Sequence, residues 1–277
     1  MGNLRSPVGE PPLFVDDTGE SNLPVVLCMH SLFLDGRMFD DFVDAAVGRF
    51  RVVRPDFRGQ GRSPVSDVPE LDMDFYAADI VQLVEQMNLQ SVNILAQSMG
   101  GDVAFRVAHE RPDLVASLAV LGSSACAEPP EQLSRFRKWV EDATAQGFTG
   151  DVLDYTMEIM IGPVTREDPT RAAAVNQTRA RISELGPTLR PAMVGVVERK
   201  SALDLLPDIQ CPVLIVSGAL DLPRPPAWSD QMHELLPNSR LWRLNDVGHS
   251  PIIEIPEVVV PELLSFFSDL ERVVQIR

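Results

Sequence analysis

A serine stands where an apolar run gives way to small residues, in the segment Ile94-Leu95-Ala96-Gln97-Ser98-Met99-Gly100-Gly101. The apolar residues predict a buried strand, and the residues after the serine predict a helix that runs to about His109. A serine in such a strand–turn–helix segment exposes its hydroxyl, and the tight turn requires small residues two positions before and after it. Ala96 and Gly100 meet that requirement, although the usual pattern has glycine at the first position. We therefore predict that Ser98 is a nucleophile; the alternative is a serine that only caps a helix.

A serine hydroxyl is a poor nucleophile until a base removes its proton, and the sequence offers four histidines for that role. His30 ends the first predicted strand, His109 lies at the far end of the helix after Ser98, and His233 lies in a surface helix. His249 stands in a loop between the last predicted strand and the final helix. We predict that His249 is the base, because its place in the chain is similar to that of the base in α/β-hydrolases.

The base in turn needs a carboxylate that fixes its tautomer and stabilises its charged form. Asp221 follows the strand Val213–Val216 after a glycine-bearing turn, so it also lies at the carboxyl end of a strand. Asp246 is a rival because it is close to His249 in the sequence, but a near neighbour in one loop rarely points at the ring. We therefore predict a triad of Ser98, Asp221 and His249.

Attack by a serine on a carbonyl creates an oxyanion that needs hydrogen-bond donors. The backbone N–H of Met99, directly after the nucleophile, is one expected donor. The second is expected from the loop after Val25–His30, at the N–H of Leu32.

Short apolar runs alternate with helical stretches along the chain. The runs predict buried strands at Val25–Met29, Arg51–Arg54, Val92–Leu95, Leu118–Leu121 and Val213–Val216, with an extended segment at Leu241–Leu244. A final helix is expected to begin near Pro256. This alternation predicts an α/β protein with a mostly parallel sheet and helices on both faces.

Residues 126–205 break the alternation, because they contain helical pieces and no convincing strand. The pieces are Pro130–Ala145, Val152–Ile161, Thr170–Leu185 and Leu189–Leu205. We therefore expect a core of residues 1–125 and 206–277 and a helical cap of residues 126–205 over the site. Apolar side chains of this cap are candidates for substrate binding, namely Trp139, Met157, Met160 and Ile161. The alternative is an all-helical elaboration without a gating role, in which these side chains only pack the cap onto the core.

Composition narrows the classes of partner. The 277 residues carry a formal net charge of −16, which disfavours nucleic acid as a partner and leaves a small-molecule substrate as the expected one. No apolar run approaches the ~18 residues of a membrane span, and Met1–Pro12 has no apolar core like that of a signal peptide. The three cysteines and four histidines show no ligand spacing, so we expect no metal and no cofactor. The unpaired cysteines favour a reducing, cytoplasmic location, and the sequence leaves the oligomeric state open.

Together with the triad segments, three further motifs resemble the α/β-hydrolase superfamily over nearly the whole chain. They are Arg54-Pro55-Asp56-Phe57-Arg58-Gly59-Gln60-Gly61-Arg62-Ser63, Gly248-His249-Ser250-Pro251 with Glu254 and Pro256, and Gly218-x-x-Asp221 followed by Pro225-Pro226. The resemblance implies an α/β-hydrolase fold with an inserted helical cap. We expect the Arg58–Ser63 segment to have a structural rather than a chemical role.

Details of the motifs narrow the expected reaction. The sequence His30-Ser31-Leu32, where most relatives have His-Gly, is similar to that of 3-oxoadipate enol-lactone hydrolases, and Ser98-Met99-Gly100-Gly101 is similar to that of hydrolases that split C–C bonds in ring-cleavage products. A serine nucleophile excludes haloalkane dehalogenases and epoxide hydrolases, which use a carboxylate. The resemblance thus implies a serine hydrolase that cleaves a carboxylic ester or lactone of a small, largely apolar molecule.

Alternatives to that reaction remain open. A C–C bond hydrolase or an acyltransferase would use the same triad, and a perhydrolase or haloperoxidase activity would be a side reaction of an esterase. A non-catalytic ligand-binding homologue is a further alternative, although no triad residue is missing.

Overall fold

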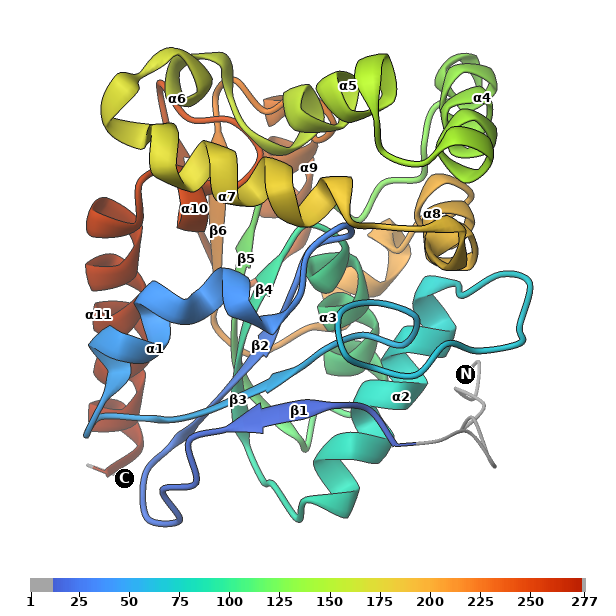
Figure 1. Ribbon diagram of the computed structural model, residues 1–277. Coiled ribbons are helices and arrows are strands. Elements are labelled where there is room, and N and C mark those ends of the chain that lie inside the picture. The colour runs from blue at the N-terminus through green and yellow to red at the C-terminus, as the bar shows by residue number, and fades with distance from the viewer. Residues whose placement is uncertain (1–11, 276–277) are drawn as a thin grey trace.

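A seven-stranded sheet forms the centre of the molecule (Figure 1), in a computed structural model that describes residues 12–275. Its strands have the order β1-β3-β2-β4-β5-β6-β7, and all of them are parallel except β1, which is antiparallel to β3. Their bounds are β1 Val15–Asp17, β2 Val25–Met29, β3 Arg51–Pro55, β4 Val92–Gln97, β5 Val115–Leu121, β6 Val213–Gly218 and β7 Ser239–Leu244. The prediction of a mostly parallel sheet is confirmed. The prediction that Met1–Pro12 is not a signal peptide concerns residues that, apart from Pro12, lie outside the described part of the chain.

The apolar composition of the central strands explains their place. Every residue of β4 and β6 is buried, as expected for strands that are covered on both faces. β4 pairs with β2 on one side and with β5 on the other. Because the central strands are parallel, the loops that follow β2, β4 and β6 meet at one edge of the sheet.

Helices cover both faces of the sheet (Figure 1). Helix α1 (Asp40–Ala46) contacts α11 (Pro256–Gln275), which begins at Pro256 as predicted. Helix α2 (Met73–Gln86) contacts α3 (Met99–Glu110), and the 3₁₀ helix η4 (Leu203–Asp208) lies between α3 and α9 (Pro226–Leu235). None of the helices in the described part of the chain is both long and apolar enough to span a membrane.

Further helices lie together beyond the carboxyl edge of the sheet, at the top of Figure 1. They are α4 (Pro130–Gln146), α5 (Gly150–Met160), α6 (Pro163–Glu167), α7 (Ala172–Ser183) and α8 (Arg190–Val197). The single helix predicted over Leu189–Leu205 is wrong, because α8 ends at Val197. The chain turns back toward the core there, since the N–H of Ala202 donates to the carbonyl of Ala125 at 2.7 Å. The inserted segment therefore leaves the core and returns to it at adjacent points.

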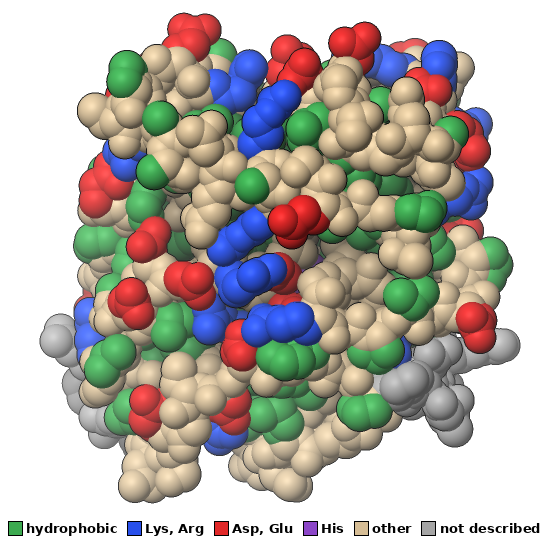
Figure 2. All heavy atoms as spheres, viewed as in Figure 1, with side chains coloured by type: hydrophobic (Ala, Val, Ile, Leu, Met, Phe, Trp, Pro, Cys, Tyr) green, Lys and Arg blue, Asp and Glu red, His purple; other side chains and the backbone are tan. Residues whose placement is uncertain are grey.

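Charged side chains of both signs are interspersed over the face seen in Figure 2. Ion pairs in the described part of the chain include Arg51 with Asp17 and Arg54 with Asp40. Such exposed pairs each stabilise the fold only slightly.

Candidate active site

The nucleophile candidate lies in a strained turn between β4 and α3. Ser98 has φ 53° and ψ −116°, a backbone conformation that residues other than glycine rarely adopt. A Cβ atom on Gly100 would lie 2.2 Å from the carbonyl oxygen of Met29, so a glycine is required there. The turn therefore holds the serine hydroxyl at the carboxyl edge of the sheet, in the arrangement that the sequence predicted.

The structure brings the three predicted triad residues together. The Ser98 Oγ lies 2.8 Å from the Nε2 of His249, and the Nδ1 of His249 lies 3.0 Å from both carboxylate oxygens of Asp221. A carboxylate can only accept, so Nδ1 carries the proton and Nε2 is free to accept the serine proton. All three residues are buried, whereas the rival Asp246 is exposed. This arrangement can generate a serine alkoxide and store its proton on the imidazole.

The other histidines have different partners. The Nδ1 of His30 lies 2.8 Å from the carbonyl of Ser31, and its Nε2 accepts the N–H of Phe57 at 2.8 Å. Burial lowers the pKa of His30, which keeps the ring neutral in this role. His109 lies beside Asp208 and His233 bonds Ser239. None of these three rings contacts Ser98.

The loop that carries His249 is fixed by two side chains whose roles the sequence did not reveal. The amide of Gln97 donates to the carbonyl of His249 at 2.6 Å. The carboxylate of Glu254 is fully buried and accepts the N–H groups of Gly248 and Ser250, at 3.1 and 3.0 Å. The motif around His249 already contained Glu254, and its place five residues after the histidine was the signal that could have found it.

Glu254 also bonds the inserted helices. It accepts the N–H of Gly162 at 3.1 Å and the hydroxyl of Thr165 at 2.8 Å. One buried carboxylate thus joins the loop that carries His249 to the first turn of α6.

The two predicted oxyanion donors are available. Within the described part of the chain, no backbone or side-chain acceptor engages the N–H of Met99 or that of Leu32. Phe33, directly after Leu32, has a positive φ of 72°, so the chain turns sharply at this point. Leu32 and Ser98 both line the same cavity.

The cavity above Ser98 and His249 contains about 470 Å³ of space not filled by atoms, part of it open to solvent. Its walls are mostly apolar and come from Leu32, Phe33, Phe136, Trp139, Ile159 and Met160, among others. Of the predicted substrate-binding residues, Trp139 and Met160 are part of this lining. Met157 and Ile161 are buried in the hydrophobic core and are not part of this lining.

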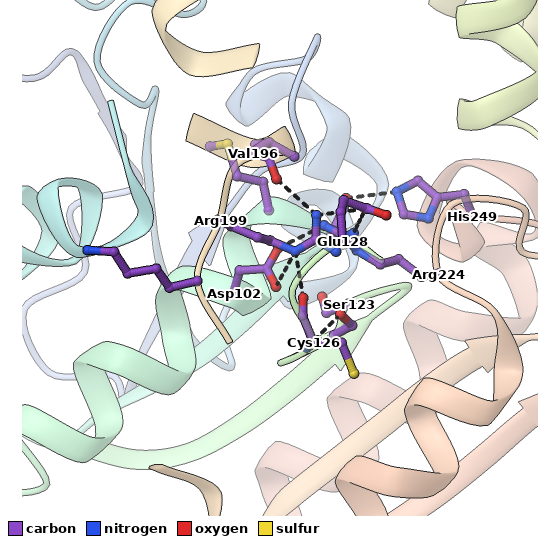
Figure 3. Close-up of polar contacts among 12 residues, drawn as sticks. Asp102, Ser123, Cys126, Glu128, Val196, Arg199, Arg224 and His249 are labelled. Atoms are coloured by element: carbon purple, nitrogen blue, oxygen red, sulfur yellow. Dashed lines mark hydrogen bonds and ion pairs between the residues drawn. The ribbon is translucent and has the colours of Figure 1, made fainter. Parts of the chain in front are cut away.

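One end of the cavity is charged, which no sequence pattern had indicated. Glu128, Arg199 and Arg224 line it there, and Asp102 of α3 lies behind them (Figure 3). Burial, together with the neighbouring Arg224, lowers the pKa of Arg199.

Cysteines and metal ligands add no further site. Cys28, Cys126 and Cys211 are free thiols. Within residues 12–275 no group of three or more His, Cys, Asp or Glu side chains is arranged to hold a metal ion.

Comparisons with known proteins agree with this architecture. A family model described as the alpha/beta hydrolase fold matches residues 24–256. The chain is 24% identical to the pimeloyl-[acyl-carrier protein] methyl ester esterase of Nitrosomonas europaea, over 90% of this chain and 96% of the relative.

Two solved structures are similar in fold. A thermophilic esterase from Thermogutta terrifontis, in its malate-bound form, has a TM-score of 0.83 and 29% identity, with 93% of each chain covered. The enol-lactonase from Burkholderia xenovorans LB400 has a TM-score of 0.82 over 92% of this chain and 96% of the other. Its sequence is 22% identical, so this second likeness concerns the fold alone.

Proposed function

This chain belongs to the α/β-hydrolase fold family, and on that premise we propose that it is a serine hydrolase that cleaves a carboxylic ester or lactone. The observation that carries the proposal is the hydrogen-bonded chain from Ser98 through His249 to Asp221, at 2.8 and 3.0 Å, beneath a mostly apolar cavity. Relatives named as esterases support this reaction class.

The proposed mechanism is acyl transfer to Ser98. As the Ser98 Oγ attacks the carbonyl carbon, its proton moves to the Nε2 of His249, and Asp221 stabilises the resulting imidazolium. The N–H groups of Met99 and Leu32 hold the oxyanion. The intermediate collapses when the alkoxide leaves with the proton from His249. A water then gives its proton to His249 and attacks the acyl-enzyme carbonyl, and His249 returns that proton to the Ser98 Oγ as the acid is released.

We further propose that residues 126–205 act as a cap that selects the substrate. Trp139, Ile159 and Met160 of this segment face the cavity that holds Ser98. Because much of the cavity wall is apolar, the expected substrate is a small molecule with an apolar part.

The test is turnover of a chain-length series of 4-nitrophenyl esters by the wild type and by Ser98→Ala. We expect the wild type to cleave short esters and Ser98→Ala to lose activity by about 10⁴-fold or more. Ser265→Ala, which changes an exposed serine on α11, is the matched control and should keep full activity. A rapid-mixing burst of nitrophenol equal to the enzyme concentration would report the acyl-enzyme. If neither esters nor lactones are turned over, the proposal is wrong.

A further inference from the structure

Two arginines at the charged end of the cavity lie between two carboxylates (Figure 3). Arg224 Nη2 donates to Asp102 Oδ2 at 2.9 Å, and the Nη1 of Arg224 donates to Glu128 Oε1 at 3.2 Å. Arg199 Nη1 donates to the same Glu128 oxygen at 2.8 Å, while its Nε donates to the carbonyl of Cys126. Both arginines are buried: Arg199 is 4% exposed and Arg224 is 3% exposed.

The two carboxylates differ in their position. Asp102 is 1% exposed, belongs to α3 of the core and does not line the cavity. Glu128 does line it, from the segment that leads into α4, and it accepts hydrogen bonds from both arginines. The two arginines and Asp102, counted without Glu128, carry a net charge of +1. The cavity end therefore matches one negative group, and in the free protein Glu128 supplies that group.

Donors without partners accumulate at this same cavity. In the described part of the chain, the buried atoms that lack a hydrogen-bond partner include Arg199 Nη2, Arg224 Nε, Trp139 Nε1 and Ser31 Oγ. All four belong to residues of the cavity lining. Burying an N–H group without an acceptor is costly, so the arginine and indole nitrogens keep unused donor capacity, which an acceptor oxygen of a ligand reaches once the surrounding side chains move.

We propose that the cavity takes a substrate with a carboxylate near its scissile ester or lactone, and that this carboxylate replaces Glu128 on Arg199 and Arg224. The inference deepens the proposed function and rests on it. Arg199 and Arg224 line the same cavity as Ser98 and His249, so one small substrate can bring its carboxylate to the arginines and its carbonyl to Ser98. Arg224 also donates its backbone N–H to Asp221 at 2.9 Å, which ties the anion site to the triad.

The first experiment compares matched esters that differ by one carboxylate. On the acyl side the pair is 4-nitrophenyl hemiglutarate and 4-nitrophenyl pentanoate; on the alcohol side it is 3-carboxy-4-nitrophenyl butyrate and 4-nitrophenyl butyrate. We expect the wild type to prefer the anionic member of one pair by about 10- to 100-fold in kcat/KM, the value of one or two charged hydrogen bonds. No preference in either pair would overturn the inference, and turnover of the neutral esters would leave the proposed function standing.

Substitutions of the arginines and of Glu128 should change the ratio of anionic to neutral turnover in opposite directions. Arg199→Gln and Arg224→Gln should bring the ratio of anionic to neutral turnover toward one. Glu128→Gln should raise that ratio, because the amide no longer competes for the arginines. Arg135→Gln, which removes a positive charge from α4 where it stacks on Tyr155, is the control and should leave the ratio unchanged. A purely structural cluster would lower both activities together and leave the ratio constant in every variant.

A binding measurement keeps the inference testable if an arginine variant does not fold or if no ester is cleaved. Glutarate is titrated calorimetrically into the wild type, with glutaramide as the neutral control. Binding of glutarate alone supports the anion site, and stronger binding to Glu128→Gln supports the displacement of Glu128. Absence of glutarate binding to both proteins overturns the inference, whatever the esterase assay shows.

Discussion

Replacing Glu254 by glutamine tests how strongly one buried carboxylate holds the catalytic loop. Its Oε2 accepts from Gly162, Thr165 and Gly248, and its Oε1 accepts from Ser250. An amide keeps one acceptor oxygen, so the NH₂ group must face an N–H donor. At least one charge-assisted bond is lost, and the others become weaker neutral bonds. The expected cost is about 3 kcal/mol of the free energy of unfolding.

The same substitution should slow catalysis, because the bonded Gly248 and Ser250 flank His249 on both sides. A shift of the imidazole by about 1 Å would lower kcat by on the order of 100-fold. The assay pairs urea unfolding with turnover of 4-nitrophenyl butyrate well below the unfolding midpoint. Glu257→Gln, which breaks an exposed pair with Arg171, is the control and should cost about 0–1 kcal/mol with normal kcat. A Glu254→Gln protein with wild-type stability and kcat would refute the reasoning.

Two further predictions concern the loops around the site. In Gly122→Ala the new Cβ would lie 2.2 Å from the carbonyl of His249, so the variant should lose more than the roughly 1–2 kcal/mol that positive φ alone costs, and kcat should fall. Gly48→Ala, with open space at a φ of 70°, isolates the cost of positive φ in the same urea assay. Burial opposes ionisation of Asp35, but hydrogen bonds from Arg37 outweigh it and lower the pKa from 3.8 to about 2. This stabilisation is present above pH 3.8 and lost as the pH falls through 2, so Asp35→Asn should destabilise the protein by up to about 1 kcal/mol more at pH 6 than at pH 3; an equal cost at both would contradict this.

Local patterns predicted the parts of the structure that depend on neighbours in sequence. The strand Val25–Met29 has the predicted bounds, because a short apolar run has one stable place in the core. Strand β1 was not predicted, since Val15–Asp17 is short, partly acidic and formed only by pairing with β3. The bounds of α8 were wrong because the turn after Val197 is set by a contact with Ala125, far away in the sequence.

The candidate site likewise has residues that the local sequence predicted and pairings that depend on distant parts of the chain. Ser98, Asp221 and His249 each follow a strand with characteristic turn residues, so their convergence could be predicted. The pairing of Arg199 with Glu128 could not be, because it joins positions 71 residues apart with no local pattern at either. Gln97 directly precedes Ser98 in the sequence, yet its hydrogen bond to the His249 carbonyl depends on the fold of a loop 152 residues later.

The inserted segment leaves the core and returns to it at adjacent points. Changes within this segment can therefore occur without changes in the core. Because Ala125 and Ala202 are joined by one hydrogen bond, the core spans the same short gap whatever helices lie between them. The entropy of closing a loop grows only slowly with its length, so this segment can be lengthened, trimmed or grafted from a relative at small cost to the core. Trp139 and Met160 would be exchanged in such a graft, whereas the triad would be retained. If this segment selects the substrate as proposed, substrate preference can change while the proposed triad stays the same.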